Sequence, residues 1–400
     1  MSKTKKLVPK RRFKNSLREN EWQLIRLGDQ AVIKGRLGWK SLKQEEYVDN
    51  GPSMIAGKHI TNGVINWYNV DHIPQWRYDE SPEIMLRNGD IIFSKDGSLG
   101  NPALIEKLNC LATINSTMML VRLKKSITPR FFYQIMLSNQ FENLIRLKVS
   151  GSSIPHLFQA DMTNFKFCAP KLTEQTQIGE FFKKLDDLIQ TQQKKLEKTK
   201  TLKSAYLAEM FPCDGELKPK LRFDGFCSDW QLKKIDNIAN RHDNQRIPIT
   251  ASNRIPGSTP YYGANGIQDY VKGFTHDGEY ILVAEDGAND LLNYPVQYVK
   301  GKIWVNNHAH VLQGKVNICD NKFLMYAFKC INMEPYLVGG GRAKLNSDIM
   351  MNIIISAPDI KEQTKIGNFF KLLDKKIALE QRKLEKLNNI KQAYLNEMFV

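Results

Sequence analysis

The sequence predicts an α/β (α+β) protein that contains two copies of one domain, each followed by a long helix. The first observation is an internal repeat: residues 169–211 and 357–399 align without a gap at an offset of 188, and 25 of the 43 positions are identical. The second is the spacing of apolar residues in both copies, which recur at intervals of three and four. Because a long internal period indicates duplication, we analyse the chain as two modules of one design.

Composition favours a folded protein whose positive charge is unevenly distributed. Hydrophobic residues make up 42% and charged residues 25% of the chain. No apolar run approaches the roughly 18 residues of a membrane span, and the basic start lacks the apolar stretch of a secretory signal. Residues 1–20 carry eight basic and one acidic side chain of the +16 total, whereas residues 21–169 and 212–357 are nearly balanced. If the modules bind a polyanion, we therefore expect a local basic patch on their surface rather than positive charge over the whole surface.

Cysteine and histidine spacings predict no metal centre. The six cysteines lie far apart and include no CxxC pair, so reduced, buried thiols are favoured over a zinc site or a disulfide framework. His308 and His310 would share one face of a strand, which suits a metal ligand pair. An incidental alternation within a strand is the simpler interpretation.

Each half of the sequence follows the same order. Residues 9–13 (PKRRF) correspond to 219–223 (PKLRF), and the WQL at 22–24 corresponds to the WQL at 230–232. A globular stretch follows, and its sequence differs between the halves. We therefore divide the chain into a basic arm at 1–19, a first module at 20–168, a helical repeat at 169–211, a linker at 212–227, a second module at 228–356 and a second helical repeat at 357–400.

Both modules are predicted to contain short buried strands and short helices. In the first, we expect strands at 90–94 and 117–123, a helix or helix pair at 129–147 and a loop at 150–156. In the second, we expect strands at 279–284, 302–305 and 309–312 and a helix at 322–330. The stretch 339–345 lies at the offset of 188 from 151–157, so the loops that precede the two long helices have stayed in register.

The helical repeats carry the seam of a coiled coil. About 35 residues at 1.5 Å each give a rod of roughly 50 Å, and two copies related by a pseudo-two-fold axis would pair antiparallel. Phe181 and Phe369 lie beside the seam and widen it, either for partner helices or for packing on their own module. The predicted seam residues are Ile178, Phe182, Leu185, Ile189, Leu196 and Tyr206 in the first repeat and Ile366, Phe370, Leu373, Ile377, Leu384 and Tyr394 in the second.

Two similar but non-identical modules on a rigid spacer would measure the distance between two sites on one extended ligand. B-DNA is such a ligand, since its major groove recurs about every 34 Å on one face. Divergent modules would recognise two different half-sites separated by bases that the protein does not touch. The layout by itself thus predicts a bipartite DNA reader.

The whole chain resembles the specificity (S) subunit of type I restriction-modification systems. The resemblance rests on the APxxEQTxIGxFF opening of both helices, their LEK and AYLxEMF ends, PKxRF with WQL, GSSIPHL at 151–157 and YYGANG at 261–266. It implies that the modules are target recognition domains and that the helices form a spacer which docks methyltransferase subunits. The first module lacks the YYGANG run, so its DNA-facing loop stays unassigned.

The resemblance also implies that chemistry belongs to partner subunits. We find no GxxxxGK[ST] phosphate loop and no GxGxxG turn, and Asn293-Tyr294-Pro295 is only a partial echo of an amino-methyltransferase motif. Adenine N6 methylation with S-adenosylmethionine would be performed by two methyltransferase subunits, and cleavage by restriction subunits that use ATP and Mg. This chain would hold no cofactor and no catalytic residue, and it would work in a prokaryotic cytoplasm on double-stranded DNA.

Candidate DNA-contacting residues are basic, amide, aromatic or hydroxyl side chains in the modules. The alternatives are solvated surface for the cations, turn roles for the asparagines and a plain connector for the loop at 150–156. The candidates in the first module are Lys34, Arg36, Lys40, Lys58, Lys95, Ser152, Ser153 and His156. Those in the second are Arg241, Asn244, Arg246, Arg254, Tyr261, Tyr262, Asn265, Lys272, Arg342 and Lys344.

Three hypotheses remain at this stage. The chain is either a non-enzymatic reader of a split DNA site or a coiled-coil adaptor whose modules bind proteins. A third possibility is an autonomous enzyme with an unrecognised site. The target bases do not follow from the sequence, because a few loop contacts determine them.

Overall fold

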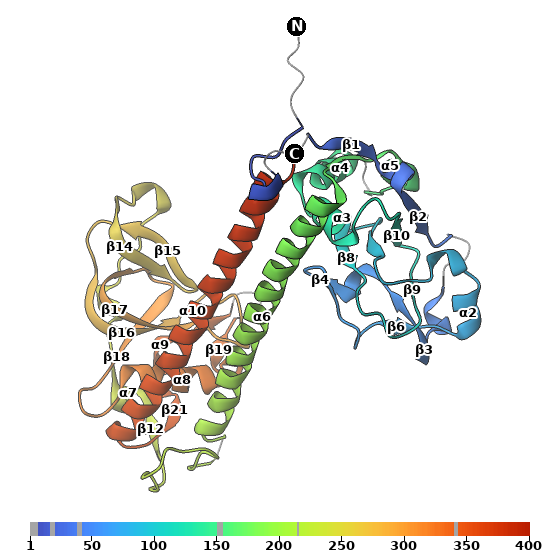
Figure 1. Ribbon diagram of the computed structural model, residues 1–400. Helices are drawn as coiled ribbons and strands as arrows, with labels where there is room; N and C mark the ends of the chain where they lie inside the picture. Colours follow the sequence, from blue (N-terminus) through green and yellow to red (C-terminus); the bar gives the residue numbers. More distant parts are fainter. Residues whose placement is uncertain (1–6, 17–20, 38–41, 150–154, 214–215, 340–342) are drawn as a thin grey trace. The chain divides into compact units, whose positions relative to one another are not determined.

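The computed structural model describes residues 7–16, 21–37, 42–149, 155–213, 216–339 and 343–400. Two units make up the chain: the first combines Met1–Gln192 with Lys383–Val400, and the second is Gln193–Arg382. The long helices α6 (Leu172–Met210) and α10 (Ile360–Met398) each contribute one end to each unit (Figure 1). The helical repeats are therefore shared between the units. Among the described helices, none combines the length and the apolar character that crossing a membrane requires.

The first module is built on two small sheets. The four-stranded sheet has the antiparallel order β2-β10-β7-β8, with β2 at Ala31–Gly35, β10 at Met118–Leu123, β7 at Ile91–Ser94 and β8 at Gly100–Leu104. The three-stranded sheet has the order β6-β3-β9, with bounds Asp71–His72, Val48–Ile55 and Ala112–Ile114. β4 (Ile60–Thr61) pairs with β5 (Val64–Ile65). The predicted strands at 90–94 and 117–123 are confirmed.

Short helices complete the first unit. Of the two alternatives predicted for 129–147, one helix or a helix pair, the structure has the pair: α3 (Pro129–Ile135) and α4 (Asn139–Val149), whose inner faces bury Phe131, Phe132 and Phe141. These rings share one core with Phe182 of α6 and with the C-terminal end of α10. The remaining helices are α1 (Leu27–Gln30), α2 (Gln75–Asp79) and α5 (Gln159–Asn164).

The second module has one larger sheet. Its order is β13-β18-β16-β17-β14-β15, antiparallel except between β14 and β17. The three strands predicted for this module are confirmed within β16, β17 and β18. The bounds are Ala239–Arg241 for β13, Pro256–Gly263 for β14, Gly266–Val271 for β15, His276–Ala284 for β16, Val296–Val305 for β17 and Ala309–Gly314 for β18.

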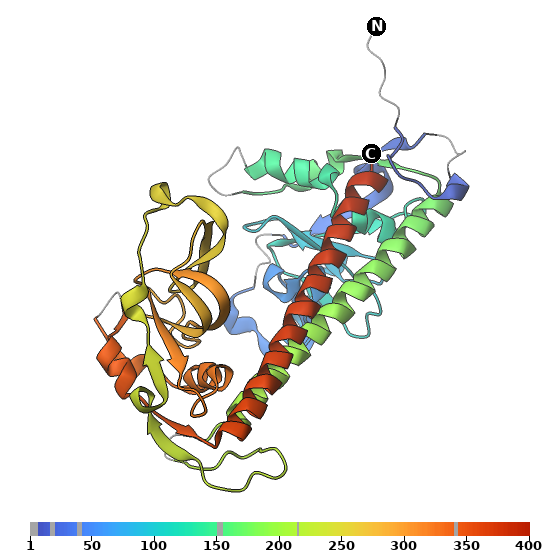
Figure 2. The same cartoon turned by 90° about the vertical axis from the view of Figure 1, so that its left-hand side faces the viewer.

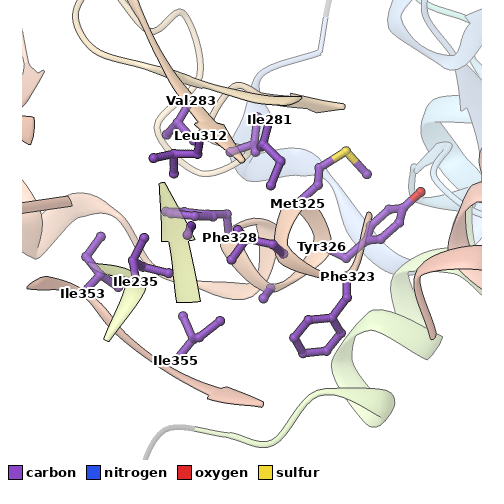
Figure 3. Close-up of a cluster of buried hydrophobic side chains, with 14 of the residues drawn as sticks. Ile235, Ile281, Val283, Leu312, Phe323, Met325, Tyr326, Phe328, Ile353 and Ile355 are labelled. Carbon is purple, nitrogen blue, oxygen red and sulfur yellow. The ribbon is translucent and has the colours of Figure 1, made fainter. Parts of the chain in front are cut away.

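Helix α8 (Asn321–Cys330) fills the core beneath this sheet, as the apolar pattern at 322–330 predicts. Asp320 caps it by accepting hydrogen bonds from the backbone N–H groups of Lys322 and Phe323. Figure 3 shows Phe328 lying among Leu312 of β18, Ile235 of α7 (Ile235–Ile238) and Ile355 of β21 (Ile354–Ala357). The smaller elements are α9 (Ser347–Asn352), β19 (Leu337–Val338) and β20 (Lys344–Leu345).

A short two-stranded ladder joins the beginning and the end of each module. β1 (Gln23–Arg26) pairs with β11 (Lys166–Ala169), and β12 (Gln231–Lys234) pairs with β21, both antiparallel. The tryptophan of each WQL motif is buried at the start of its ladder. The repeated motif therefore closes each module just before its long helix begins.

The two long helices run antiparallel. In the first unit, Phe181 contacts Tyr394 with ring centroids 4.9 Å apart, and Asp186 pairs with Lys391 at 2.6 Å. In the second unit, Tyr206 contacts Phe369 with centroids 5.1 Å apart. Later residues of α6 therefore contact earlier residues of α10, so the two helices run in opposite directions. Figure 2 shows this helix pair from a second direction. The predicted antiparallel coiled coil is confirmed.

Most of the predicted seam lies inside. Phe181 is covered by Phe13 and Tyr394, and Phe369 by Phe223 and Tyr206. Both phenylalanines therefore pack within their own chain. The buried seam residues are Ile178, Phe182, Leu185, Leu196, Ile366, Phe370, Leu373 and Leu384, and the half-buried ones are Ile189, Tyr206, Ile377 and Tyr394.

Candidate nucleic-acid interface

The PKxRF and EQT motifs form a clamp that fixes each module on its helix. Arg12 donates two hydrogen bonds to Glu174, from Nε to Oε1 at 2.9 Å and from Nη2 to Oε2 at 2.6 Å. Arg222 donates the equivalent pair to Glu362, both at 2.7 Å. These hydrogen bonds raise the pKa of Arg222 above its ordinary value. The sequence contains this arginine and this glutamate at matching positions in both halves. Our prediction of site residues did not include them.

The glutamine of each EQT motif completes this clamp. Gln175 accepts a hydrogen bond from Thr128 N and donates to the carbonyl oxygens of Ser126 and Pro170. Gln363 accepts from Asp320 N and donates to the carbonyls of Ile318 and Pro358. Each buried amide thereby joins a module loop to the first turn of a helix. The motif is therefore architectural, since it attaches each module to the first turn of its own long helix.

A turn with the sequence Asp-Gly follows the same strand in both modules. Lys95-Asp96-Gly97 follows β7, and Glu285-Asp286-Gly287 follows β16. The loop in front of each long helix docks on this turn: Leu157 N donates to the Lys95 carbonyl at 2.9 Å, and Leu345 N donates to the Glu285 carbonyl at 2.7 Å. Both leucines are fully buried. We call these two places the DG sites.

In the first DG site, one carboxylate holds two basic side chains. Asp96 accepts a hydrogen bond from Lys95 Nζ at 3.1 Å and forms a second with Nδ1 of His156. The His156 ring lies 4.3 Å from the ring of Phe158. Lys95 and His156, two of the predicted candidates, are thus brought together from positions 61 residues apart.

The second DG site has the same frame with other side chains. Glu285 stands where the first module has Lys95, and it accepts from Arg246 at 2.6 Å and pairs with Lys344 at 3.1 Å. Burial by itself would raise the pKa of Glu285, but the Arg246 hydrogen bond and the neighbouring positive groups hold it below its usual value. Asp286 forms a hydrogen bond with Nδ1 of His308.

A buried histidine ties the second site to the strands behind it. His310 Nδ1 lies 2.7 Å from Asp243 Oδ2, and its Nε2 lies 2.9 Å from the carbonyl of Leu345. Each ring nitrogen of His310 is therefore within hydrogen-bond distance of an oxygen atom, one on a carboxylate and one on the backbone. Burial alone would raise the pKa of Asp243, but the hydrogen bond and charge of His310 lower it overall. Within the described ranges no group of three side chains could hold a metal ion.

Several predicted cations are used inside the modules. Arg36 is 3% exposed and donates to the carbonyl of Ile114 at 3.2 Å, so its guanidinium is used within the module. Arg246 is held by Glu285 and Asp243, and Arg254 lies 4.3 Å above the ring of Tyr261. These arginines stabilise the fold, and only some of the candidates can face a ligand.

The other candidates differ in exposure. Lys272 and Asn244 are exposed, and Lys34 is half-buried. Neither Lys34 nor Lys272 forms an ion pair with a described residue. Lys58 is exposed but pairs with Asp71, and Arg241 pairs with Asp243 and Asp348. Tyr261 is buried and Tyr262 is half-buried. Lys40, Ser152, Ser153 and Arg342 lie outside the described residues.

The family of the chain follows from its match to a family model. Residues 19–200 and 227–389 match the type I restriction modification DNA specificity domain. The chain belongs to this family. Both matched stretches contain one DG site and the first part of one long helix, so the specificity domain occurs twice.

Individual relatives agree with this assignment. A putative type I restriction enzyme specificity subunit of Haemophilus influenzae is 45% identical over 152 residues, 38% of either chain. The MjaVIII specificity subunit of Methanocaldococcus jannaschii is 21% identical over 94% of this chain and 91% of its own. The crystal structure of a type I S subunit from M. genitalium matches 98% of this chain and 99% of its own with a TM-score of 0.70 at 18% identity, which shows the same fold.

Proposed function

We propose that this chain is the DNA sequence-specificity subunit of a type I restriction-modification complex and that it recognises an asymmetric target in two halves. The observation that carries the proposal is the pair of DG sites. Their backbone frame is the same, but Lys95 in one corresponds to Glu285 in the other, and the histidine partners come from different elements. Two copies of one frame with different side chains fit two half-sites of different sequence.

The charge distribution supports selective binding. Arg36, Arg246 and Arg254 are occupied within the fold, which leaves exposed or half-exposed groups such as Lys34, Lys272 and Lys344 to meet phosphate. Phosphate contacts position a protein on DNA, and contacts with base edges supply sequence information. Because basic and acidic residues nearly balance in residues 21–169 and 212–357, we expect sequence-independent binding to be weak relative to specific binding.

Partner subunits supply the chemistry in this proposal. Each unit carries the same clamp between PKxRF and EQT at one end of the helix pair, so the complex would contain two equivalent docking regions and two methyltransferase subunits. S-adenosylmethionine would be bound by the methyltransferases, and ATP with Mg by restriction subunits. This chain would act without a catalytic residue of its own, in the cytoplasm of a prokaryote.

A footprint of the complex with its methyltransferase tests the proposal. We expect two short protected patches separated by an unprotected gap. One continuous patch would contradict bipartite recognition, and no protection at all would favour a protein-binding adaptor. Methyl transfer to DNA by this chain alone would instead show that it is an enzyme.

Exchanging one module tests whether the halves act independently. Replacing residues 20–168 with the corresponding module of another specificity subunit should change one half-site of the methylated sequence and leave the other unchanged. Methylome sequencing of cells that express the hybrid complex measures this directly. Changes in both half-sites would contradict independent recognition.

A further inference from the structure

The second module holds one leucine almost completely in water. Leu292 is 95% exposed and lies in the loop between β16 and β17, five residues after Gly287 of the second DG site. Its neighbours Asn289, Asp290 and Asn293 are all polar and exposed. The adjacent Leu291 is 43% exposed, so the two leucines form a small apolar surface flanked by polar side chains.

The tip of this loop is held by a side-chain turn. Asp290 accepts hydrogen bonds from the backbone N–H groups of Leu292 at 3.0 Å and Asn293 at 2.9 Å, and from the Asn293 side chain at 3.0 Å. These bonds, led by the one from the Asn293 backbone, keep the pKa of Asp290 below its ordinary value. The turn therefore fixes the backbone conformation at Leu292.

Both ends of the loop are anchored as well. Asn265 of the YYGANG hairpin donates to the Gly287 carbonyl at 2.8 Å and accepts from Asn289 N at 3.0 Å. Downstream, the buried Tyr294 donates from its hydroxyl to the Ala284 carbonyl at 2.8 Å. The loop that carries Leu292 is therefore held beside Gly287 of the second DG site.

We infer that Leu292 contacts the C5-methyl group of a thymine in the major groove of the half-site bound by the second module. This inference rests on the proposed function. The thymine methyl is the apolar group that base edges offer in the major groove, and because the backbone at Leu292 is already held by Asp290, the loop itself need not be ordered on binding. The first module has a comparable side chain: Tyr68 is 99% exposed, on a turn held by Asn66.

The test replaces thymine with deoxyuridine, which removes only the methyl group. The complex of the full chain with its methyltransferase is titrated with target duplexes that carry one such replacement at each thymine of the second half-site. We expect one replacement to weaken binding about three- to fivefold, as burial of one methyl group predicts. Leu292→Ala should weaken binding to unmodified DNA by a similar factor and should no longer respond to that replacement.

Val316→Ala is the matched control. Val316 is 85% exposed in the same module, but it follows the C-terminal end of β18, whereas His308 of the DG site precedes the N-terminal end. This variant should therefore respond to deoxyuridine like the unchanged protein. The inference is overturned if the second half-site contains no thymine, if no replacement weakens binding, or if Leu292→Ala keeps the sensitivity. Failure of the unchanged complex to bind any specific sequence would overturn the proposed function instead.

Discussion

The guanidinium of Arg12 and the carboxylate of Glu174 form a bidentate ion pair between residues 162 positions apart. Their side chains are 4% and 1% exposed. The pair joins the PKxRF segment to the first turn of α6, next to the ring contact between Phe13 and Phe181. The geometry of the first module on its helix therefore depends on a charge pair that water does not reach.

Arg12→Ala should lower the free energy of unfolding of the first unit by about 3–5 kcal/mol, because Glu174 is left as an uncompensated buried charge. Urea denaturation measures this change. Arg146→Ala removes an exposed ion pair with Glu142 and should cost at most about 0.5 kcal/mol. Equal effects of the two substitutions would contradict a structural role for the buried pair.

Arg36→Ala should destabilise the first unit without weakening DNA binding by the folded protein. The substitution leaves a cavity and removes the donor to the Ile114 carbonyl, for which we expect about 2–3 kcal/mol. Denaturation and DNA titration are measured on the same preparation. A loss of DNA affinity with unchanged stability would return Arg36 to the set of DNA contacts.

Lys272→Ala should weaken binding to all DNA sequences alike. Its exposed ammonium forms no ion pair among the described residues, so it is free to neutralise one phosphate. Removing one such contact should lower the slope of log K against log salt concentration by about 0.9. Lys218→Ala is the control: it removes a linker lysine that forms an exposed ion pair with Asp229, and it should leave the slope unchanged. Equal slopes for the unchanged protein and both variants would exclude a phosphate contact by Lys272.

The stability of the second unit should fall in acid partly through Asp243. Its pKa in the folded protein is below its ordinary value of 3.8, where the lowering by His310 outweighs the effect of burial. The carboxylate thus contributes stability above about pH 4, and this contribution is lost as the pH falls through the folded pKa. Asp243→Asn should lower the denaturation midpoint at pH 7 and make the profile flatter below pH 4. The exposed Asp277→Asn serves as a control that should keep the original profile.

Lengthening both helices should lengthen the gap of the DNA target. Seven residues inserted after Gln192 and after Glu380 preserve the heptad seam and add about 10 Å, or about three base pairs at 3.4 Å each. Methylome sequencing should show unchanged half-sites with the longer gap. As a control, seven residues inserted after Glu216 in the linker should leave the length of the gap unchanged. A gap of unchanged length after the helical insertions would contradict the spacer role.

The duplication, the two long helices and their antiparallel seam were predictable from the sequence. Their signals are periodic or repeated, and a side chain every three or four positions such as Ile178 and Phe182 shares one helix face by local geometry alone. The strands around the DG turns were predictable for the same reason, since short apolar runs bounded by Asp-Gly turns are local patterns.

The tertiary structure alone decided which charged residues are free. Arg36, Arg246 and Lys272 are similar cations in the sequence, but only Lys272 lies exposed without an acidic partner among the described residues. Burial and pairing depend on residues distant in the chain, such as Ile114 for Arg36 and Glu285 for Arg246, and no local pattern encodes those contacts. The backbone conformation at Leu292 depends in the same way on Asp290 and Asn265, which together hold its loop beside the second DG site.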